Sequence, residues 1–379
     1  MKSFDVIVLG GGINGLATAY HLLRRGVKNL GLLEQFELGH GRGSSHGKSR
    51  ITRSSYSSAK YVKLIQVAHQ QEWPRLSHDS GKRLLLPTPG CFYGPGVEQY
   101  LESMKAVPEV EDMYRVLRPE QARATFPMFR FPDSPLVIED RTGSVVAAEE
   151  TMTFLAHKVK AGATVVEGCP VESVTRNPES IVLSSPLGQF ECGKLVVTAG
   201  AWLGRLLPDF APRLMVAHQD VGYFQIEGSQ QFPVWVYCAG QGDSYYGLPS
   251  FGRPGAKVAR HRTGNEGDDP DRVIHTEMSS KARVELREFL AAQFSGEAEL
   301  IGYEACLYTN TVNEDFILDH HPEDSRIVVG SACSGHGFKF GPLTGRLLAD
   351  LVLDGKTGIP LFEEYRDAFR LKAHGAWAR

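Results

Sequence analysis

The residues whose types and spacing could do chemistry begin with a glycine-rich turn near the N-terminus. Residues 10–15 read GGGING, a G-x-G-x-x-G motif between an apolar run at 4–9 and a helical pattern. In such a turn Gly10 permits the tight bend, Gly12 lets a pyrophosphate approach the backbone, and Gly15 lets the helix pack close to the strand. The free N–H groups and the positive end of the helix dipole attract phosphate. The motif therefore predicts a phosphate-binding turn.

An acidic residue at the end of the next apolar run extends this interpretation. Glu34 follows Gly15 by 19 residues, where a carboxylate can accept hydrogen bonds from ribose hydroxyls. The chain has 40 glycines, so the motif alone could also be a plain strand turn. Strand, turn, helix and terminal acid in register favour a dinucleotide site in a βαβ unit.

A second candidate for ligand contact is the segment 41–53. It combines glycines and hydroxyl side chains with four cations, Arg42, Lys48, Arg50 and Arg53, and has no apolar period. We expect a loop that wraps around an anionic or polar ligand. A solvated basic loop is the alternative, because Gly/Ser segments with charges are common.

Composition narrows the classes of function. The 379 residues can bury two cores. With 41 basic and 44 acidic residues, the net charge of −3 offers no global attraction for nucleic acid or an anionic membrane.

Six scattered cysteines without zinc-type spacing predict reduced thiols and no metal site. His320 and His321 would point apart on a strand, so a structural turn is the better interpretation. Without a signal or spanning segment, a cytoplasmic location is expected.

The elements that must position these residues follow from periodicity. Helical spacing is expected at 13–23, 61–76, 151–160 and 280–294, and buried strands at 164–167, 194–198 and 326–330. Prolines dominate 84–143, and 215–320 is rich in strands. We expect a first domain from 1–83, 146–214 and 321–379, and a second domain from 84–145 and 215–320. A helix opening at Pro342 follows the last glycine-rich turn.

Four motifs in this order resemble the monomeric sarcosine oxidase family, which includes N-methyltryptophan oxidase and peroxisomal sarcosine/pipecolate oxidase. They are residues 10–15, the SSHG loop at 44–47, ACLYTNT at 305–311 and SGHGFK at 334–339. The resemblance spans essentially the whole chain. It implies an α/β (α+β overall) fold, in which a Rossmann-like FAD-binding domain is interrupted by a substrate domain with a mostly antiparallel sheet.

The resemblance implies a FAD-dependent amine oxidase. The expected substrate is a secondary amino acid such as sarcosine, pipecolate or another N-alkyl or cyclic amino acid. The amine would become an imine while O2 is reduced to H2O2, in a monomer without nucleic-acid or membrane partners. The alternatives are an oxidase or desaturase of a larger imine or amine acid in a biosynthetic pathway, a flavin dehydrogenase with another electron acceptor, a nicotinamide dehydrogenase, and a flavin-binding protein without turnover.

Cys306 stands where the family joins FAD covalently through a cysteinyl thioether to the flavin methyl group (8α-S-cysteinyl). A thiolate needs a nearby cation or an electron-poor acceptor, and oxidised flavin is such an acceptor. Taken in isolation, a lone cysteine is more often a small buried apolar residue. The resemblance of the surrounding motif favours the covalent link.

Arg53 and Lys339 occupy the family's carboxylate-binding positions. A carboxylate substrate needs fixed cations, preferably a planar guanidinium. Taken singly, each could be a surface charge, as most of the 41 cations are expected to be.

Lys257 lies where the family keeps its oxygen-activating lysine, and Arg50 is expected over the flavin. Reduction of O2 develops negative charge, which a fixed cation stabilises. Tyr246 and His261 match side chains that hold the substrate by hydrogen bonds, although His261 could instead lie in an exposed basic turn.

The resemblance implies further contacts. The expected catalytic residues are Lys257, His261, Arg50 and Tyr246, and the expected substrate-binding residues are Arg53, Lys339, Tyr246, Gly335 and Tyr237. The expected FAD-binding residues are Gly10, Gly12, Ile13, Asn14, Gly15, Glu34, Gln35, Ser44, Ser45, His46, Arg50, Ile51, Val171, Ala199, Gly200, Trp202, Cys306, Tyr308, Gly335, His336, Gly337, Phe338 and Lys339.

Overall fold

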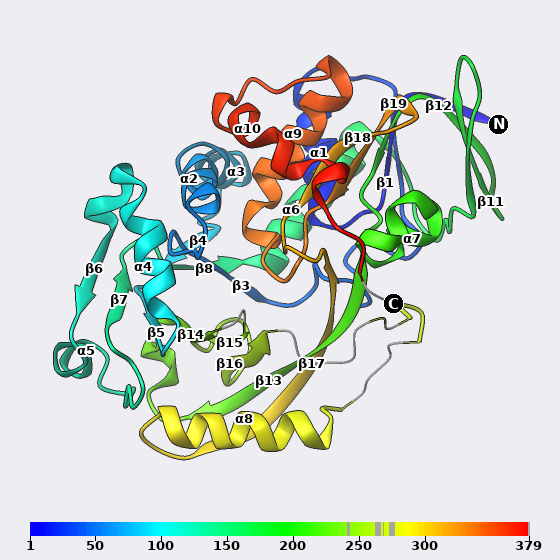
Figure 1. Ribbon diagram of the computed structural model, residues 1–379. Helices are drawn as coiled ribbons and strands as arrows, with labels where there is room; N and C mark the ends of the chain where they lie inside the picture. Colours follow the sequence, from blue (N-terminus) through cyan, green and yellow to red (C-terminus); the bar gives the residue numbers. More distant parts are fainter. Residues whose placement is uncertain (241–242, 262–266, 268, 273–276, 378–379) are drawn as a thin grey trace.

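The computed structural model describes residues 1–240, 243–261, 267, 269–272 and 277–377. Within these ranges, strands form two eight-stranded sheets and one three-stranded sheet (Figure 1). This is the mixed α/β architecture expected from the sequence. Within the same ranges, no helix has both the length and the apolar character needed to cross a bilayer.

The first sheet carries the glycine-rich turn and is called the nucleotide sheet. Its strands are β1 (Lys2–Leu9), β2 (Leu30–Leu33), β9 (Thr164–Val166), β10 (Ser173–Arg176), β11 (Ile181–Ser185), β12 (Gly188–Val197), β18 (Ile317–His321) and β19 (Asp324–Ser331). β1 lies between β12 and β2 and is parallel to both. Apolar clusters cover both faces of this sheet, which explains why its central strands read as nearly continuous apolar runs.

Three helices cover one face of the nucleotide sheet: α1 (Ile13–Arg24), α6 (Ala148–Gly162) and α9 (Gly341–Asp354). α1 packs against both α6 and α9 (Figure 1). Gly345 sets the approach of α9, because a Cβ atom there would lie 2.4 Å from the Ala17 Cβ and 2.8 Å from the backbone nitrogen of Thr18. The two helices are therefore in near backbone contact.

The second large sheet is called the substrate sheet. Its strands, in spatial order, are β17 (Ala298–Asn310), β13 (Met215–Ile226), β16 (Ala256–His261), β15 (Asp243–Leu248), β14 (Val234–Gly240), β5 (Gly90–Tyr93), β7 (Val137–Asp140) and β6 (Tyr114–Leu117). Every neighbouring pair is antiparallel except β5 with β14. Helix α8 (Ser280–Gln293) packs against it through an aromatic-rich core.

The expected domain boundary at 320 falls inside β18. Although β18 begins at Ile317, it pairs with β19 in the nucleotide sheet. The strands of the substrate sheet come from 90–140 and 215–310.

A small third sheet contains part of the basic segment that was expected to be entirely loop. Its strands are β3 (Ser49–Thr52), β8 (Ser144–Ala147) and β4 (Leu85–Pro87), in that order. Ile51 and Val145 lie opposite each other in register. Arg50, the cation of β3, is thus held on a paired strand and not on a free loop.

The remaining elements surround these sheets. The α-helices are α2 (Ala59–Val67), α3 (Trp73–Ser80), α4 (Val97–Lys105), α5 (Pro119–Thr125), α7 (Leu203–Leu206) and α10 (Pro360–Tyr365), and a π-helical turn (Ala68–Glu72) joins α2 to α3. Short 3-10 helices occupy Pro108–Met113, Gly200–Trp202, Pro208–Arg213, Ser229–Gln231, Phe338–Phe340, Arg366–Phe369 and Leu371–Ala373.

Replacing Gly345 by valine should destabilise the fold, because the added side chain meets backbone atoms of α1. We expect a loss of about 3 kcal/mol in the free energy of unfolding, the upper part of the range for overpacking. Gly358→Val is the control, since a Cβ at Gly358 has no atom within 4 Å and should change stability by less than about 0.5 kcal/mol. Urea unfolding measures both, and equal stabilities would contradict the close helix contact.

Candidate functional site

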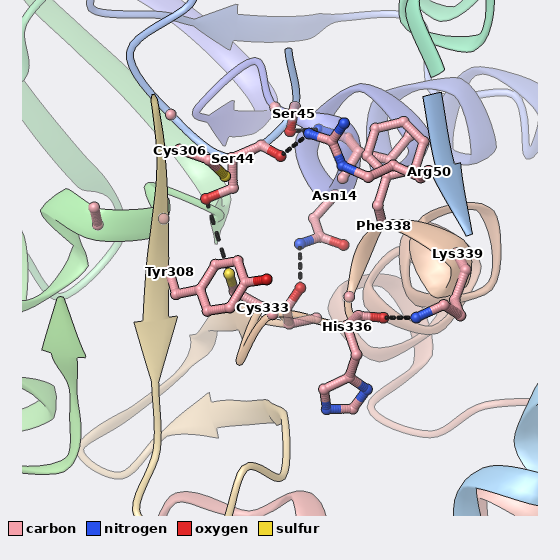
Figure 2. A pocket seen from close by; sticks show the side chains of 18 of the residues that line it. Asn14, Ser44, Ser45, Arg50, Cys306, Tyr308, Cys333, His336, Phe338 and Lys339 are labelled. Carbon is pink, nitrogen blue, oxygen red and sulfur yellow. Dashed lines mark hydrogen bonds between the residues drawn. The ribbon is translucent and has the colours of Figure 1, made fainter. Parts of the chain in front are cut away.

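A cavity of about 1060 Å³ extends from the glycine-rich turn to the substrate sheet. Its lining includes the 10–14 turn, the basic segment, one face of β15, β16 and β17, and the 330–339 segment. Figure 2 shows side chains from these separate segments pointing toward one another. The cavity therefore joins the predicted phosphate site to the residues expected to act on a substrate.

The turn between β1 and α1 depends on glycine for two different reasons. Gly10 has a positive φ of 102°, and a Cβ atom there would lie 2.5 Å from the Thr198 carbonyl oxygen. A Cβ on Gly15 would lie 1.8 Å from the Gly10 carbonyl oxygen, so Gly15 sets the helix against the strand. At Gly12 a Cβ would meet only the Ser45 Oγ, at 3.2 Å. The backbone of Gly12 is therefore open toward the cavity.

Glu34 is buried at the end of β2 and holds this turn. Its Oε2 accepts a hydrogen bond of 2.6 Å from the Gly11 N–H, and its Oε1 accepts one of 2.9 Å from the Phe36 N–H. These bonds fix the carboxylate at the rim of the cavity that it lines. A carboxylate in this place can still accept hydrogen bonds from ribose hydroxyls through its remaining lone pairs.

The ring of Trp202 lines the same end of the cavity, and Phe36 packs behind it. The Phe36 and Trp202 rings meet edge to face at 5.5 Å, and the Arg42 guanidinium lies 4.7 Å from the centre of the Phe36 ring. Trp202 Nε1 donates a hydrogen bond of 2.8 Å to Asp271. This wall suits a planar base.

The basic segment is tied across the cavity to β17. Arg50 donates hydrogen bonds to the carbonyl oxygens of Ser44, His46 and Ser49, at 2.8, 2.6 and 2.8 Å. The Ser44 hydroxyl bonds to the carbonyl oxygen of Leu307. Burial lowers the pKa of His46 to about 4, with the Arg50 charge adding to the effect. Arg50 thus presents a fixed guanidinium beside Phe338, 5.3 Å from its ring centre.

Cys306 lines the cavity from β17. Burial raises the pKa of its thiol, and the charge of Arg50 opposes that shift. A second thiol, Cys333, also lines the cavity, 3.8 Å from the Ser44 hydroxyl, and accepts a bond from the Thr309 N–H (Figure 2). Sequence reasoning missed Cys333. Its place directly before the SGHGFK motif was the available signal.

A half-buried cation, Arg53, and a buried one, Lys339, converge on the ring of Tyr56. The Arg53 guanidinium lies 4.1 Å from the ring centre and the Lys339 Nζ 5.6 Å from it. Within the described residues, the buried Arg53 Nη1 has no hydrogen-bond partner, while Lys339 donates to the His336 carbonyl oxygen at 3.1 Å. Burial, with the charges of Arg53 and Arg50, holds the pKa of Lys339 well below its usual value. This positive pocket favours an anionic ligand.

Three further candidates stand on the substrate sheet. Lys257 is 5% exposed and donates to the Ser49 carbonyl oxygen at 3.3 Å. Burial lowers its pKa to about 7, and burial raises that of Tyr246 to about 12. His261 lies 3.5 Å from Glu314 and packs beside Tyr308. All three candidates line the cavity.

Tyr237 does not lie in the cavity, contrary to the expectation that it binds substrate. Its ring packs edge to face against Tyr93 and Phe289 at 5.3 and 5.2 Å. Val236 and Cys238 line the cavity instead, because successive side chains on a strand point to opposite faces. Gly15 also lies behind the lining, where it packs α1 against the strand.

The other expected contact residues line this cavity. They are Gly10, Gly12, Ile13, Asn14, Glu34, Gln35, Ser44, Ser45, His46, Arg50, Ile51, Val171, Ala199, Gly200, Trp202, Cys306, Tyr308, Gly335, His336, Gly337, Phe338 and Lys339. A dinucleotide-binding sheet whose phosphate turn opens into a cationic cavity defines the molecule as an enzyme of the nucleotide-cofactor class.

Comparisons with known proteins identify the cofactor. The family model of FAD dependent oxidoreductases (DAO) matches residues 5–351. The chain is 32% identical to monomeric sarcosine oxidase from Bacillus sp. (strain B-0618), over 97% of both chains. It is 33% identical to the peroxisomal sarcosine oxidase of Homo sapiens, over 92% of both. L-proline dehydrogenase from P. horikoshii has the same fold, with a TM-score of 0.82 at 18% identity over 98% of this chain and 97% of that one. The chain belongs to the FAD dependent oxidoreductase family, in the branch that contains these sarcosine oxidases.

Proposed function

We propose that this FAD-dependent oxidoreductase oxidises a secondary amino acid to its imine and reduces O2 to H2O2. The observation that carries the proposal is the pair of cations, Arg53 and Lys339, that line the cavity beginning at the phosphate turn. Sarcosine oxidase relatives over nearly the full chain support a small amino acid as substrate. We further propose that the enzyme is a cytoplasmic monomer whose substrate domain comprises 84–145 and the chain from 215 to the end of β17 at Asn310.

The residues that line the cavity suit FAD lying along it from the phosphate turn to the substrate sheet. The open backbone at Gly12 and the first turn of α1 would bind the pyrophosphate, and Glu34 the ribose. Cys306 and Arg50 would then border the flavin. When bound, FAD accepts two electrons from an amine and delivers them to O2.

Arg53 and Lys339 would bind the carboxylate of the substrate. Burying two cations side by side is unfavourable unless an anion joins them. A carboxylate can accept hydrogen bonds from the Arg53 Nη1, which has no partner among the residues that the structure describes, and from the Lys339 ammonium. These charge-assisted bonds are stronger than neutral ones. Tyr246 and His261, from the facing sheet, would orient the amine. With the carboxylate bound at one end of the substrate and the amine at the other, one C–N bond would face the cofactor.

Lys257 and Arg50 would assist the oxygen half of the reaction. Negative charge develops on O2 as it is reduced, and fixed cations in a cavity of low dielectric stabilise that charge strongly. Lys257 meets this requirement when its amine is protonated. The two half-reactions therefore depend on different cations.

The function can be tested with matched pairs of amines. We expect sarcosine, pipecolate, proline or another N-alkyl amino acid to bleach the flavin without oxygen and to release peroxide in air. Amines without the carboxylate, such as piperidine beside pipecolate, should react far more slowly. Bleaching without peroxide would favour a dehydrogenase with another acceptor. No bleaching by any amino acid of the panel would refute the proposal.

Cys306 should carry FAD covalently. Denatured, washed protein should keep flavin fluorescence in the pellet, and Cys306→Ala should release all of its flavin into the supernatant while still binding it reversibly, because the phosphate turn is independent of the thiol. Cys333→Ala is the matched control and should keep the bond. Flavin released from the wild-type chain expressed with adequate FAD would contradict the link.

Removing either cation of the carboxylate pair should weaken substrate binding or transition-state stabilisation. Arg53→Met and Lys339→Met should each cost on the order of 2 to 4 kcal/mol, or roughly 30-fold to 1,000-fold in kcat/KM. Carboxylate inhibitors should bind more weakly by a similar factor. Lys281→Met, at an exposed position on α8, is the control. Unchanged inhibitor affinity in both cavity variants would refute the clamp.

A further inference from the structure

Glu304 lines the cavity from β17, two residues before Cys306, and the proposed function gives it no task. Its side chain is 21% exposed. Tyr223 donates its hydroxyl to Oε2 at 2.7 Å, and Arg253 Nη1 donates to Oε1 at 3.0 Å. Both carboxylate oxygens are therefore fixed by other side chains.

Strand register places Glu304 on the same face as Lys257. The central strand β13 pairs Val221 with Glu304 on one side and Tyr223 with Lys257 on the other. Val221 and Tyr223 are two residues apart, so they and their partners point to one face of the sheet. That face lines the cavity. Glu304 and Lys257 thus flank the Tyr223 ring, whose centre lies 6.0 Å from the Lys257 Nζ.

Cations surround this carboxylate. A Cβ atom on Gly47 would lie 3.1 Å from Glu304 Oε2 and 3.3 Å from Arg50 Nη1, so the Arg50 guanidinium is a neighbour of Glu304. The Arg253 guanidinium stacks 3.7 Å from the Tyr223 ring centre.

The charged and titratable groups around Lys257 come from several elements. Its neighbours are Arg50 and His46 from the basic segment, Arg253 from the turn before β16, Tyr223 from β13, and Glu304 and Cys306 from β17. On β15, the residue paired with Lys257 is the apolar Leu248, and Tyr246 pairs with Ala259. Among these neighbours in the described part of the chain, Glu304 supplies the negative charge at neutral pH. The two arginines oppose protonation of the lysine, and the carboxylate favours it.

We propose that Glu304 is a positioning residue that keeps the Lys257 amine protonated and so sets the pH range in which the reduced enzyme reacts with O2. This inference rests on the proposed role of Lys257. Without the carboxylate, the buried Lys257 and the half-buried Arg50 and Arg253 would repel one another. The lysine would then release its proton, because an arginine does not.

The sign of the pH dependence follows from the charge of the lysine. Burial and the Arg50 charge bring the pKa of Lys257 down to about 7, and Glu304 raises it. The fast reaction with O2 should be present below this pKa and lost as the pH rises through it. Removing the carboxylate should move that loss to lower pH, by about one pH unit or more.

The substitution Glu304→Gln tests this role, because it removes the negative charge while keeping nearly the same side-chain volume. Stopped-flow reoxidation should slow on the order of 10-fold at pH 7 to 8 and approach the wild-type rate near pH 5, whereas anaerobic reduction by the amine should change much less. Arg253→Gln should move the profile the opposite way, because it removes a cation. Glu299→Gln, exposed on the same strand, is the control and should leave the profile unchanged.

A readout independent of turnover is the titration of the lysine itself. In the holoenzyme labelled with lysine carrying ¹⁵N at Nζ, the Lys257 resonance is the one missing from the Lys257→Met variant. Its pKa should fall in Glu304→Gln and rise in Arg253→Gln. These opposite shifts are a signature that general loss of folding does not produce.

The outcomes separate the two proposals. If Lys257→Met reoxidises at the wild-type rate, the role of the lysine is wrong, whatever Glu304 does. If Lys257→Met is slow but Glu304→Gln leaves both the pH profile and the lysine pKa unchanged, the inference about Glu304 is overturned. A loss that is equal at every pH, or shifts of the same sign in both variants, also overturns it. Should Glu304→Gln fail to fold, the shift in Arg253→Gln decides.

Discussion

The burial of positive charge in one cavity is the constraint on which the rest of this structure depends. Arg50, Arg53, Lys257 and Lys339 all line it, and cations removed from water are costly unless they are compensated. Carbonyl oxygens, aromatic faces and Glu304 supply part of that compensation. An anionic ligand can supply the rest, so this arrangement of cations favours binding of a carboxylate or a phosphate.

The architecture divides this charge between rigid elements. The nucleotide sheet presents backbone N–H groups at the turn into α1, and the substrate sheet presents Lys257 on β16 and Cys306 on β17. The small sheet connects them, because β3 carries Arg50 and pairs with β8. Side chains on paired strands are held more precisely than side chains on loops. The fold thus brings groups from segments far apart in the sequence to one cavity.

The sequence predicted some residues well and others poorly, for reasons of geometry. Tyr237 was expected in the substrate site, yet strand alternation turns it into the aromatic core and exposes Val236 and Cys238 to the cavity. Glu304 was missed because nothing in its local sequence distinguishes a cavity-facing position from an ordinary one, and Cys333 was missed although it directly precedes the SGHGFK motif. Their neighbours Tyr223 and Ser44 lie 81 and 289 residues away along the chain.

The sequence by itself determined the elements whose signal is local. The phosphate turn, the acid at Glu34 and the helical periods each lie within a short stretch, where backbone sterics and side-chain spacing are decisive. Tertiary structure alone decided the register of β13 between β16 and β17, the pairing of β3 that replaced an expected loop, and the facing of Arg53 and Lys339 across Tyr56. The strand contacts among these depend on which faces of distant strands meet. A one-residue change of register would turn every side chain of a strand to the other face of the sheet.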